Sequence, residues 1–139
     1  MSEVAALQAA LAGEHACVYG YGVVGGVLTG DEEEPARAAF DTHRRRRDDL
    51  ARLLRDSGAE PVAALPGYAL PLPVRTAAEA RELAGLLEAR QAVLLAELVA
   101  AAGSSALRET AARSLADAAV RGASWSGAVT ALPGLDPAP

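Results

Sequence analysis

Apolar residues recur at every third or fourth position over four stretches of the chain, and this spacing predicts four amphipathic helices. The apolar face of the first stretch carries Leu7, Leu11, Glu14, Val18, Tyr21, Gly25 and Leu28. Residues at this spacing share one face of a helix, so the Glu14 carboxylate is expected among core side chains. The second stretch has the same spacing over Phe40, His43, Arg47, Leu50 and Leu54. Ionisable groups in an apolar seam are costly unless they are paired, protonated or bound to metal, so Glu14, His43 and Arg47 are candidate functional residues.

The first two helices are expected to form an antiparallel hairpin. The first runs from Glu3 to Leu28 and stops at a turn formed by Gly30 and Asp31. Acidic residues at positions 31–34 precede Pro35, an arrangement typical of a helix N-terminus, and this second helix extends to about Asp56. The connection between the two helices is too short for any other arrangement.

Residues 59–75 interrupt the helical pattern with closely spaced prolines among apolar residues. A helix cannot propagate through that spacing, and the apolar content argues against a disordered linker. Fully extended, this segment can reach about 55 Å, whereas a helix of about 25 residues is roughly 37 Å long. The segment is therefore long enough to return along the whole length of a helical hairpin.

The last two helices form a second predicted hairpin. Thr76 and Glu79 make a capping box that starts the third helix, which ends at Gly103. Ser104 or Ser105 caps the fourth, which is expected to reach about Ala131. Two hairpins joined by one long segment predict an all-α, single-domain fold over residues 1–139, an antiparallel four-helix bundle with a long crossover between its second and third helices.

Composition and charge narrow the possible functions. The chain has 139 residues, of which 51% are hydrophobic, mostly Ala, Leu and Val, and this favours a helical fold. All 13 basic residues are Arg, which excludes Schiff-base chemistry by Lys and a phosphate-binding loop that needs Lys. The net charge of −5 disfavours nucleic acid and anionic membranes as partners. No segment suggests a leader peptide or a membrane span, so a cytoplasmic protein is expected.

The run of four arginines at positions 44–47 is accompanied by acidic residues at helical spacing. Arg44 stands four residues before Asp48, and Arg45 four before Asp49. Such pairs stabilise an exposed helix face. We therefore interpret the run as a charge-balanced surface rather than a nucleic-acid site.

Two motifs resemble a known family. The run Glu14-His15-Ala16-Cys17-Val18-Tyr19-Gly20-Tyr21-Gly22-Val23-Val24-Gly25, with the later run His43-Arg44-Arg45-Arg46-Arg47-Asp48-Asp49-Leu50, resembles an uncharacterised ferritin-like family of actinobacteria, the DUF4439 domain. The resemblance covers nearly the whole chain. It implies a ferritin-like fold and no established activity.

In ferritin-like proteins a di-iron site takes one Glu from each of two helices and Glu-x-x-His from each of the other two. Glu14 suits the first of these positions. The tetrad of the second helix keeps His43 but has Phe40 where the Glu belongs, and the third helix offers Glu88 and Glu97 with Arg90 and Gln91 between them. The fourth helix has no His, and its centre reads Asp117-Ala118-Ala119-Val120-Arg121. The resemblance therefore implies a degenerate di-iron site.

Three interpretations of this site remain, and one of them, general acid or base catalysis, is disfavoured because the sequence offers no nucleophile and no oxyanion device. The favoured one is a structural, buried polar cluster of Glu14, His43, Arg47 and Gln91, with no cofactor. The alternative is a single iron or other divalent metal ion held by Glu14, His43 and Glu88, with water completing the shell. Cys17, the only cysteine, is expected to be an inert buried thiol.

The leading functional hypothesis is a non-catalytic ferritin-like module for binding or scaffolding, with a protein or a small ligand as its partner. The alternative is a metal-dependent oxidase or ferroxidase that uses a reduced site around Glu14 and His43. Glycines at positions 20, 22, 25 and 26 allow close approach of another backbone, within the bundle or between subunits, and Trp125 is a candidate to fill the space opposite. A homodimer through the first or second helix is expected.

Overall fold

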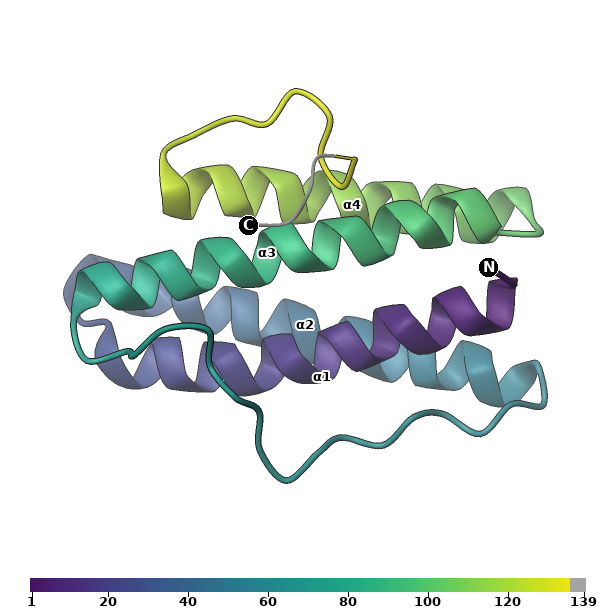
Figure 1. Ribbon diagram of the computed structural model, residues 1–139, viewed down its shortest axis with the longest axis horizontal. Helices are drawn as coiled ribbons and strands as arrows, with labels where there is room; N and C mark the ends of the chain where they lie inside the picture. Colours follow the sequence, from purple (N-terminus) through teal and green to yellow (C-terminus); the bar gives the residue numbers. More distant parts are fainter. Residues whose placement is uncertain (136–139) are drawn as a thin grey trace.

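The computed structural model describes residues 1–135, and within them the chain forms four α-helices, one 3-10 turn and no β-strand (Figure 1). In chain order the elements are α1 (Glu3–Val27), η1 (Gly30–Glu32), α2 (Glu33–Asp56), α3 (Ala77–Ala101) and α4 (Ser105–Ser126). The predicted all-α class is confirmed. None of these helices is long and apolar enough to cross a membrane.

Side-chain caps define where three of the helices begin. Thr76 accepts a hydrogen bond from the backbone N–H of Glu79, and Ser104 accepts one from that of Leu107, as the sequence predicted. Ser2 caps α1 in the same way, because its side chain accepts a hydrogen bond from the backbone N–H of Ala5. Each of these oxygens satisfies a backbone donor that the first helical turn leaves without a partner.

The fourth helix is shorter than predicted. It ends at Ser126 rather than near Ala131, because Gly127 adopts a left-handed conformation with φ of 73°. Glycine has no Cβ to oppose that conformation, so it commonly terminates a helix. Residues 128–135 leave α4 and fold back over α3 and α4 (Figure 1).

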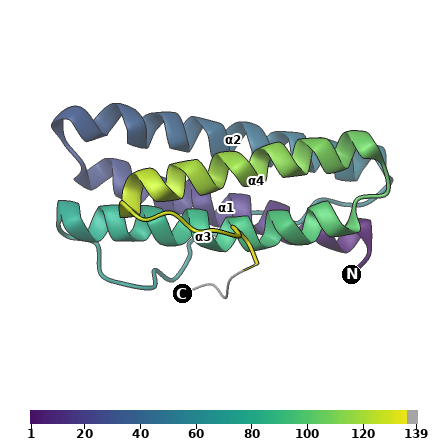
Figure 2. The same ribbon diagram turned by 90° about the horizontal axis from the view of Figure 1, so that it is seen from above.

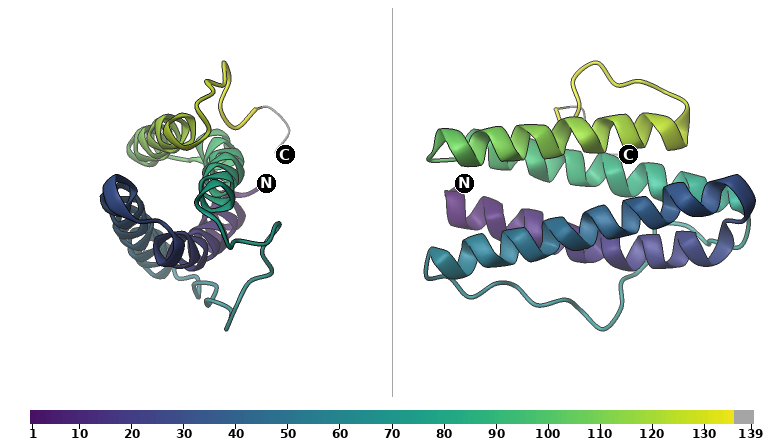
Figure 3. Two further views of the ribbon diagram at one scale, coloured as in Figure 1. Left: turned by 90° about the vertical axis from the view of Figure 1, so that its left-hand side faces the viewer. Right: turned by 180° about the vertical axis from the view of Figure 1, so that it is seen from behind.

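The helices run along the long axis of the molecule (Figure 2). α1 packs along both α2 and α3, and α3 packs along α4, whereas α2 and α4 are more widely separated. The end-on view shows this open side between α2 and α4 (Figure 3). Across it, Arg46 of α2 pairs with Asp117 of α4.

Most buried apolar residues of the described chain fall into two clusters. One contains Cys17, Tyr21, Val24, Leu28, Ala36, Ala39, Ala80, Leu83, Ala84 and Leu87. The other contains Ala6, Leu7, Ala10, Leu11, Leu50, Leu54, Leu98 and Ala111. Between them along α1, α2 and α3 lie four buried polar residues, Glu14, His43, Glu88 and Gln91. The bundle therefore has a polar layer at the middle of its length.

The stripe on α1 differs slightly from the prediction. Cys17 and Val24 are buried, whereas Val18 is half-buried and Gly25 is exposed. Strict alternation of four and three residues follows a repeat of 3.5, and a straight helix with 3.6 residues per turn drifts away from that line. Glu14 and Tyr21 are buried as expected.

The connection between α2 and α3 runs without helix from the end of one to the start of the other, along the outside of the bundle (Figure 1). Gln8 of α1 holds it by donating to the Glu60 carbonyl at 2.7 Å and accepting from the Val62 N–H at 2.8 Å. Further along the connection, the centroid of the Tyr68 ring lies 5.5 Å from the centroid of the Tyr19 ring. The segment thus packs on its own bundle, as its apolar content allowed.

Candidate functional site

The polar layer brings together side chains from three helices. Glu14 comes from α1, His43 from α2, and Glu88 and Gln91 from α3, and each is at most 1% exposed. Each occupies a position on the apolar stripe of its helix, so helical periodicity alone turns these four side chains inward. Their polar atoms must find partners inside the protein.

His43 bridges the two carboxylates. Its Nδ1 lies 2.5 Å from Oε2 of Glu14, and its Nε2 lies 2.9 Å from Oε1 of Glu88. An ionised carboxylate oxygen can only accept a hydrogen bond, so both ring nitrogens carry protons when Glu14 and Glu88 are ionised. Burial by itself lowers the pKa of His43, but the neighbouring Cys17 and the hydrogen bonds with Glu14 and Glu88 outweigh burial and raise it. His43 is therefore an imidazolium at neutral pH.

Gln91 fixes the free oxygen of Glu14. Its Nε2 donates to Oε1 of Glu14 at 2.9 Å and to the Ala10 carbonyl at 3.1 Å. Within residues 1–135, its Oε1 has no hydrogen-bond partner. The amide thus uses its donor capacity to hold one carboxylate in a single orientation.

Tyr21 and Trp125 extend the network from Glu88 to α4. The Tyr21 hydroxyl donates to Oε1 of Glu88 at 2.5 Å and accepts from Nε1 of Trp125 at 3.0 Å. The Tyr21 ring also stacks on the His43 ring, with centroids 5.3 Å apart. Burial, together with the charge of Glu88, raises the pKa of Tyr21, so the phenol stays protonated and keeps donating.

Two arginines complete the network at its edge. Arg121 of α4 lies 3.4 Å from both oxygens of Glu88 and donates to Asp117 at 2.7 Å. Arg46 of α2 also binds Asp117. Burial opposes the charge of Asp117, but the two guanidinium groups outweigh it and lower its pKa. The connected acids are Glu14, Glu88 and Asp117, and the connected bases are His43, Arg46 and Arg121. With His43 protonated, their formal charges cancel.

Cys17 adds a possible metal ligand on the Nδ1 side of His43. Donor atoms of Glu14, Cys17 and His43 all lie within 4.8 Å of one another, and all three residues are buried. Burial raises the pKa of the Cys17 thiol to about 11, so the sulfur is protonated at neutral pH. Glu88 faces the opposite nitrogen of the ring. In this arrangement Glu14 and Glu88 cannot share one ion bound to His43, as the predicted set of Glu14, His43 and Glu88 would require.

Arg47 does not join the cluster, contrary to the prediction. Its side chain is 28% exposed and pairs with Asp48 at 2.9 Å. A long side chain can reach water from the margin of an apolar stripe, so the Arg47 guanidinium is solvated at little cost. Arg46, one residue earlier, turns toward α4 instead. Glu97 and Arg90, the other charged residues considered on α3, are exposed.

Sequence reasoning did not predict how Tyr21, Trp125 and Arg46 join the network. Tyr21 stood on the predicted stripe, but nothing in the sequence paired its hydroxyl with Glu88. The contact of Tyr21 with Trp125 joins residues 104 positions apart, so no local signal could have revealed it. Arg46 was one of four consecutive arginines, and only the relative position of α2 and α4 distinguishes it.

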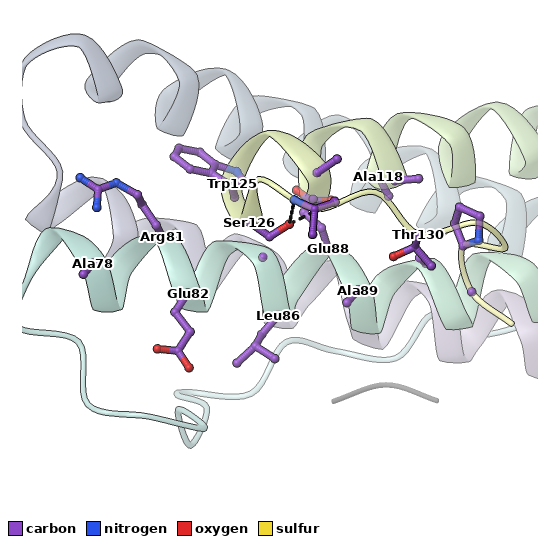
Figure 4. A pocket seen from close by; sticks show the side chains of 18 residues that line it. Ala78, Arg81, Glu82, Leu86, Glu88, Ala89, Ala118, Trp125, Ser126 and Thr130 are labelled. Carbon is purple, nitrogen blue, oxygen red and sulfur yellow. Dashed lines mark hydrogen bonds between the residues drawn. The ribbon is translucent and has the colours of Figure 1, made fainter. Parts of the chain in front are cut away.

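A pocket of about 600 Å³ adjoins the network between α3 and α4 (Figure 4). Residues 128–134 close one side of it, and the α3 and α4 walls are mainly Ala and Gly. Glu88 and Trp125 line the pocket, while Arg81 at its margin is held by Glu32 at 2.7 Å. The pocket lining is thus mainly apolar, and the buried residue Glu88 of the network lies in its wall.

Most of the chain resembles a family of unknown function and a conserved hypothetical protein. A family described as a domain of unknown function (DUF4439) matches residues 6–137. A crystal structure of a conserved hypothetical protein, Rv2844, from Mycobacterium tuberculosis, is 35% identical to this chain, with a TM-score of 0.88 over 90% of this chain and 95% of that one. A comparison of the chain with curated proteins found no match. The chain belongs to the DUF4439 family.

Proposed function

We propose that this DUF4439 protein is a ferritin-like bundle that acts as a non-catalytic binding or scaffolding module, with a charge network in place of a di-iron centre. The ferritin-like assignment rests on two antiparallel helical hairpins and a connection that spans the bundle between α2 and α3. The buried acids Glu14 and Glu88 occupy the middle of α1 and α3, where such a centre would need them.

The residues do not fit a di-iron centre. Such a site needs Glu-x-x-His on two helices, and α2 has Phe40 three residues before His43 while α4 has no His. Arg121 lies 3.4 Å from Glu88, where a second metal ion would need that carboxylate. A fixed positive charge at that distance opposes binding of a cation.

One observation carries the proposal: His43 donates from both ring nitrogens to the two buried carboxylates. A buried ion cluster is stable when its charges are balanced and its charged groups are hydrogen-bonded, and here the formal charges cancel and His43 contacts both Glu14 and Glu88. It needs no metal to compensate Glu14 and Glu88. Its role is then to fix the register of α1, α2 and α3, as some buried polar groups do.

The binding role rests on the pocket and on exposed helix surface. A volume of about 600 Å³ lies in the range of small-molecule sites, and its walls suit an apolar ligand. The glycines at positions 22, 25 and 26 of α1 are exposed, and a Cβ on any of them would meet open space. This surface supports a homodimer through α1. Because Cys17 is a free thiol, a reducing, cytoplasmic setting belongs to the proposal.

The alternative function is a reduced metal centre with oxidase or ferroxidase activity. It is supported by the donor atoms of Glu14, Cys17 and His43, which lie within 4.8 Å of one another. An iron-loading experiment distinguishes the non-catalytic function from the oxidase or ferroxidase function. Fe²⁺ is added to the protein without oxygen, unbound iron is removed, and oxygen uptake is followed after air is admitted.

The non-catalytic proposal expects no oxygen uptake above that of buffer with Fe²⁺. Iron bound at one ion per chain, with oxygen uptake lost in Glu14→Ala and kept in Glu97→Ala, would overturn it. Glu97 is the control because it is an exposed carboxylate outside the polar layer. Circular dichroism of both variants verifies that they remain helical.

A further inference from the structure

We propose that Glu14, Cys17 and His43 form a binding site for a single divalent ion of the zinc or cobalt(II) class, with water as the fourth ligand. The site lies on the Nδ1 side of His43 and includes a thiolate, which the ferritin-like di-iron pattern does not use. The inference goes beyond the proposed function and does not rest on it. A redox-inert ion there joins α1 to α2 without adding oxidase chemistry.

The positions of the donor atoms support such a site. Glu14 and Cys17 are three residues apart on α1 and therefore share its inner face, while His43 comes from α2. Their donor atoms lie within 4.8 Å of one another. Ligand atoms around a tetrahedral zinc ion stand about 3.3 to 3.7 Å apart, from the usual bond lengths of about 2.0 to 2.3 Å. Small side-chain shifts are enough to admit the ion.

The surrounding hydrogen bonds already orient the ligands. A histidine that binds metal through one nitrogen usually donates from the other to a carboxylate, which fixes its tautomer. His43 has this partner, because its Nε2 faces Glu88 at 2.9 Å. Gln91 holds Oε1 of Glu14 at 2.9 Å, and Oε2 is left facing Nδ1. Glu88 and Gln91 are thus positioning residues for the ligands.

Binding leaves the charge of the buried layer unchanged. Thiol and imidazolium ligands lose their protons when they bind a metal ion. The ion displaces the proton on Nδ1 of His43 and the proton on the Cys17 sulfur. Two positive charges enter as two protons leave, so the layer acquires no net charge that burial would penalise.

The ligand set selects the class of ion. Thiolate and imidazole favour zinc and similar transition metals, whereas Mg²⁺ and Ca²⁺ prefer oxygen ligands throughout. Cobalt(II) takes the place of zinc in such sites and gives an optical signal. It is therefore the appropriate probe.

The experiment titrates Co²⁺ into the reduced, chelator-stripped full chain without oxygen. Cys17 is the only cysteine, so a thiolate-to-cobalt charge-transfer band can arise only from that residue. We expect the band to saturate at one Co²⁺ per chain and to disappear when Zn²⁺ is added. No band in the wild-type protein would overturn the proposal, whatever the behaviour of any variant.

Variants identify the remaining ligands. His43→Asn should weaken Co²⁺ binding at least about 100-fold, whereas His15→Asn should not change it, because His15 contacts the crossover segment at the Val62 carbonyl. Glu88→Gln should keep the band but weaken binding about 10- to 100-fold. Equal binding by the wild-type protein and His43→Asn would overturn the assignment. Oxygen uptake after iron loading would count against the proposed function and leave this site standing.

Discussion

His43 is the residue on which the buried layer depends, because it is the one cation between Glu14 and Glu88. We predict that His43→Leu lowers the free energy of unfolding by about 3 to 5 kcal/mol, since both carboxylates lose their shared donor while buried. Urea unfolding followed by circular dichroism measures the loss. Arg47→Ala, one turn further along α2, is the control and should cost less than about 1 kcal/mol, because its pair with Asp48 is exposed. Similar losses in the two variants would contradict this account of the layer.

The charge on His43 also predicts how stability depends on pH. Its pKa is raised in the folded protein above the unfolded value of about 6.5. The stabilisation is therefore complete below about pH 6.5 and is lost as the pH rises above that value. Between pH 7 and 9, the free energy of unfolding of the chelator-treated protein should fall by about 1.4 kcal/mol per pH unit more steeply than that of His43→Asn. Parallel slopes would show that His43 is neutral in the folded state. Cys17 titrates in both proteins, so the comparison isolates His43.

At the scale of the residue, the sequence predicted which polar side chains are buried more accurately than it predicted their hydrogen-bond partners. Glu14, His43 and Gln91 could be placed inside because each lies on an apolar stripe, and periodicity follows from the helix alone. Arg47 satisfied the same pattern yet lies at the surface, because a long side chain can reach water from the margin of a stripe. Pairing of Tyr21 with Glu88 and Trp125 depends on how the helices are placed relative to one another, which no single stripe encodes.

At the scale of the element, the glycines inside helices are of two kinds. Some lie where two helices pack closely, and others lie where a side chain would have room. A Cβ on Gly20 of α1 would lie 2.5 Å from a methyl carbon of Leu87 on α3, so the Leu87 side chain would have to shift to accommodate it. On α3, a Cβ on Gly85 would meet only Ser126, at an ordinary contact distance of 3.9 Å. We predict that Gly20→Ala destabilises the protein by about 1 kcal/mol, because overpacking exceeds the gain in helix propensity. Gly85→Ala should stabilise it by about 0.5 to 1 kcal/mol. Thermal or urea unfolding of the two variants tests the pair, and a stabilising Gly20→Ala would contradict close contact of α1 with α3.

Helix boundaries followed from local chemistry wherever a cap or a proline fixed them. Thr76 and Ser104 begin their helices as predicted because a side-chain cap is a local interaction. The end of α4 was wrong by about five residues, since the sequence there remains compatible with helix until Pro133. Gly127 ends the helix earlier by adopting a positive φ. The segment that follows then packs on α3 and α4.

The arrangement of the whole molecule was predictable in part. Four apolar stripes and one long connection leave few alternatives to a bundle of two hairpins. The wide separation of α2 and α4 was not predictable, because it depends on side chains that meet across the bundle rather than along one helix. Arg46 and Asp117 bridge this side, and α4 otherwise packs on α3.

At the scale of the whole molecule, the surface of α1 favours assembly with a second copy of the chain around a two-fold axis. The glycines at positions 22, 25 and 26 are exposed and leave open space where side chains would project, so a second backbone could approach closely. An isologous contact along this face would bring the same helix from both subunits together. We predict a homodimer of the 14.2 kDa chain in solution at micromolar concentration, measured by light scattering after size exclusion. Gly25→Glu should convert it to a monomer that keeps its helical content, because position 25 is exposed within one subunit. Ala116→Glu, at an exposed position on α4, should leave the dimer intact. A wild-type protein that elutes and scatters as a monomer would exclude the dimer.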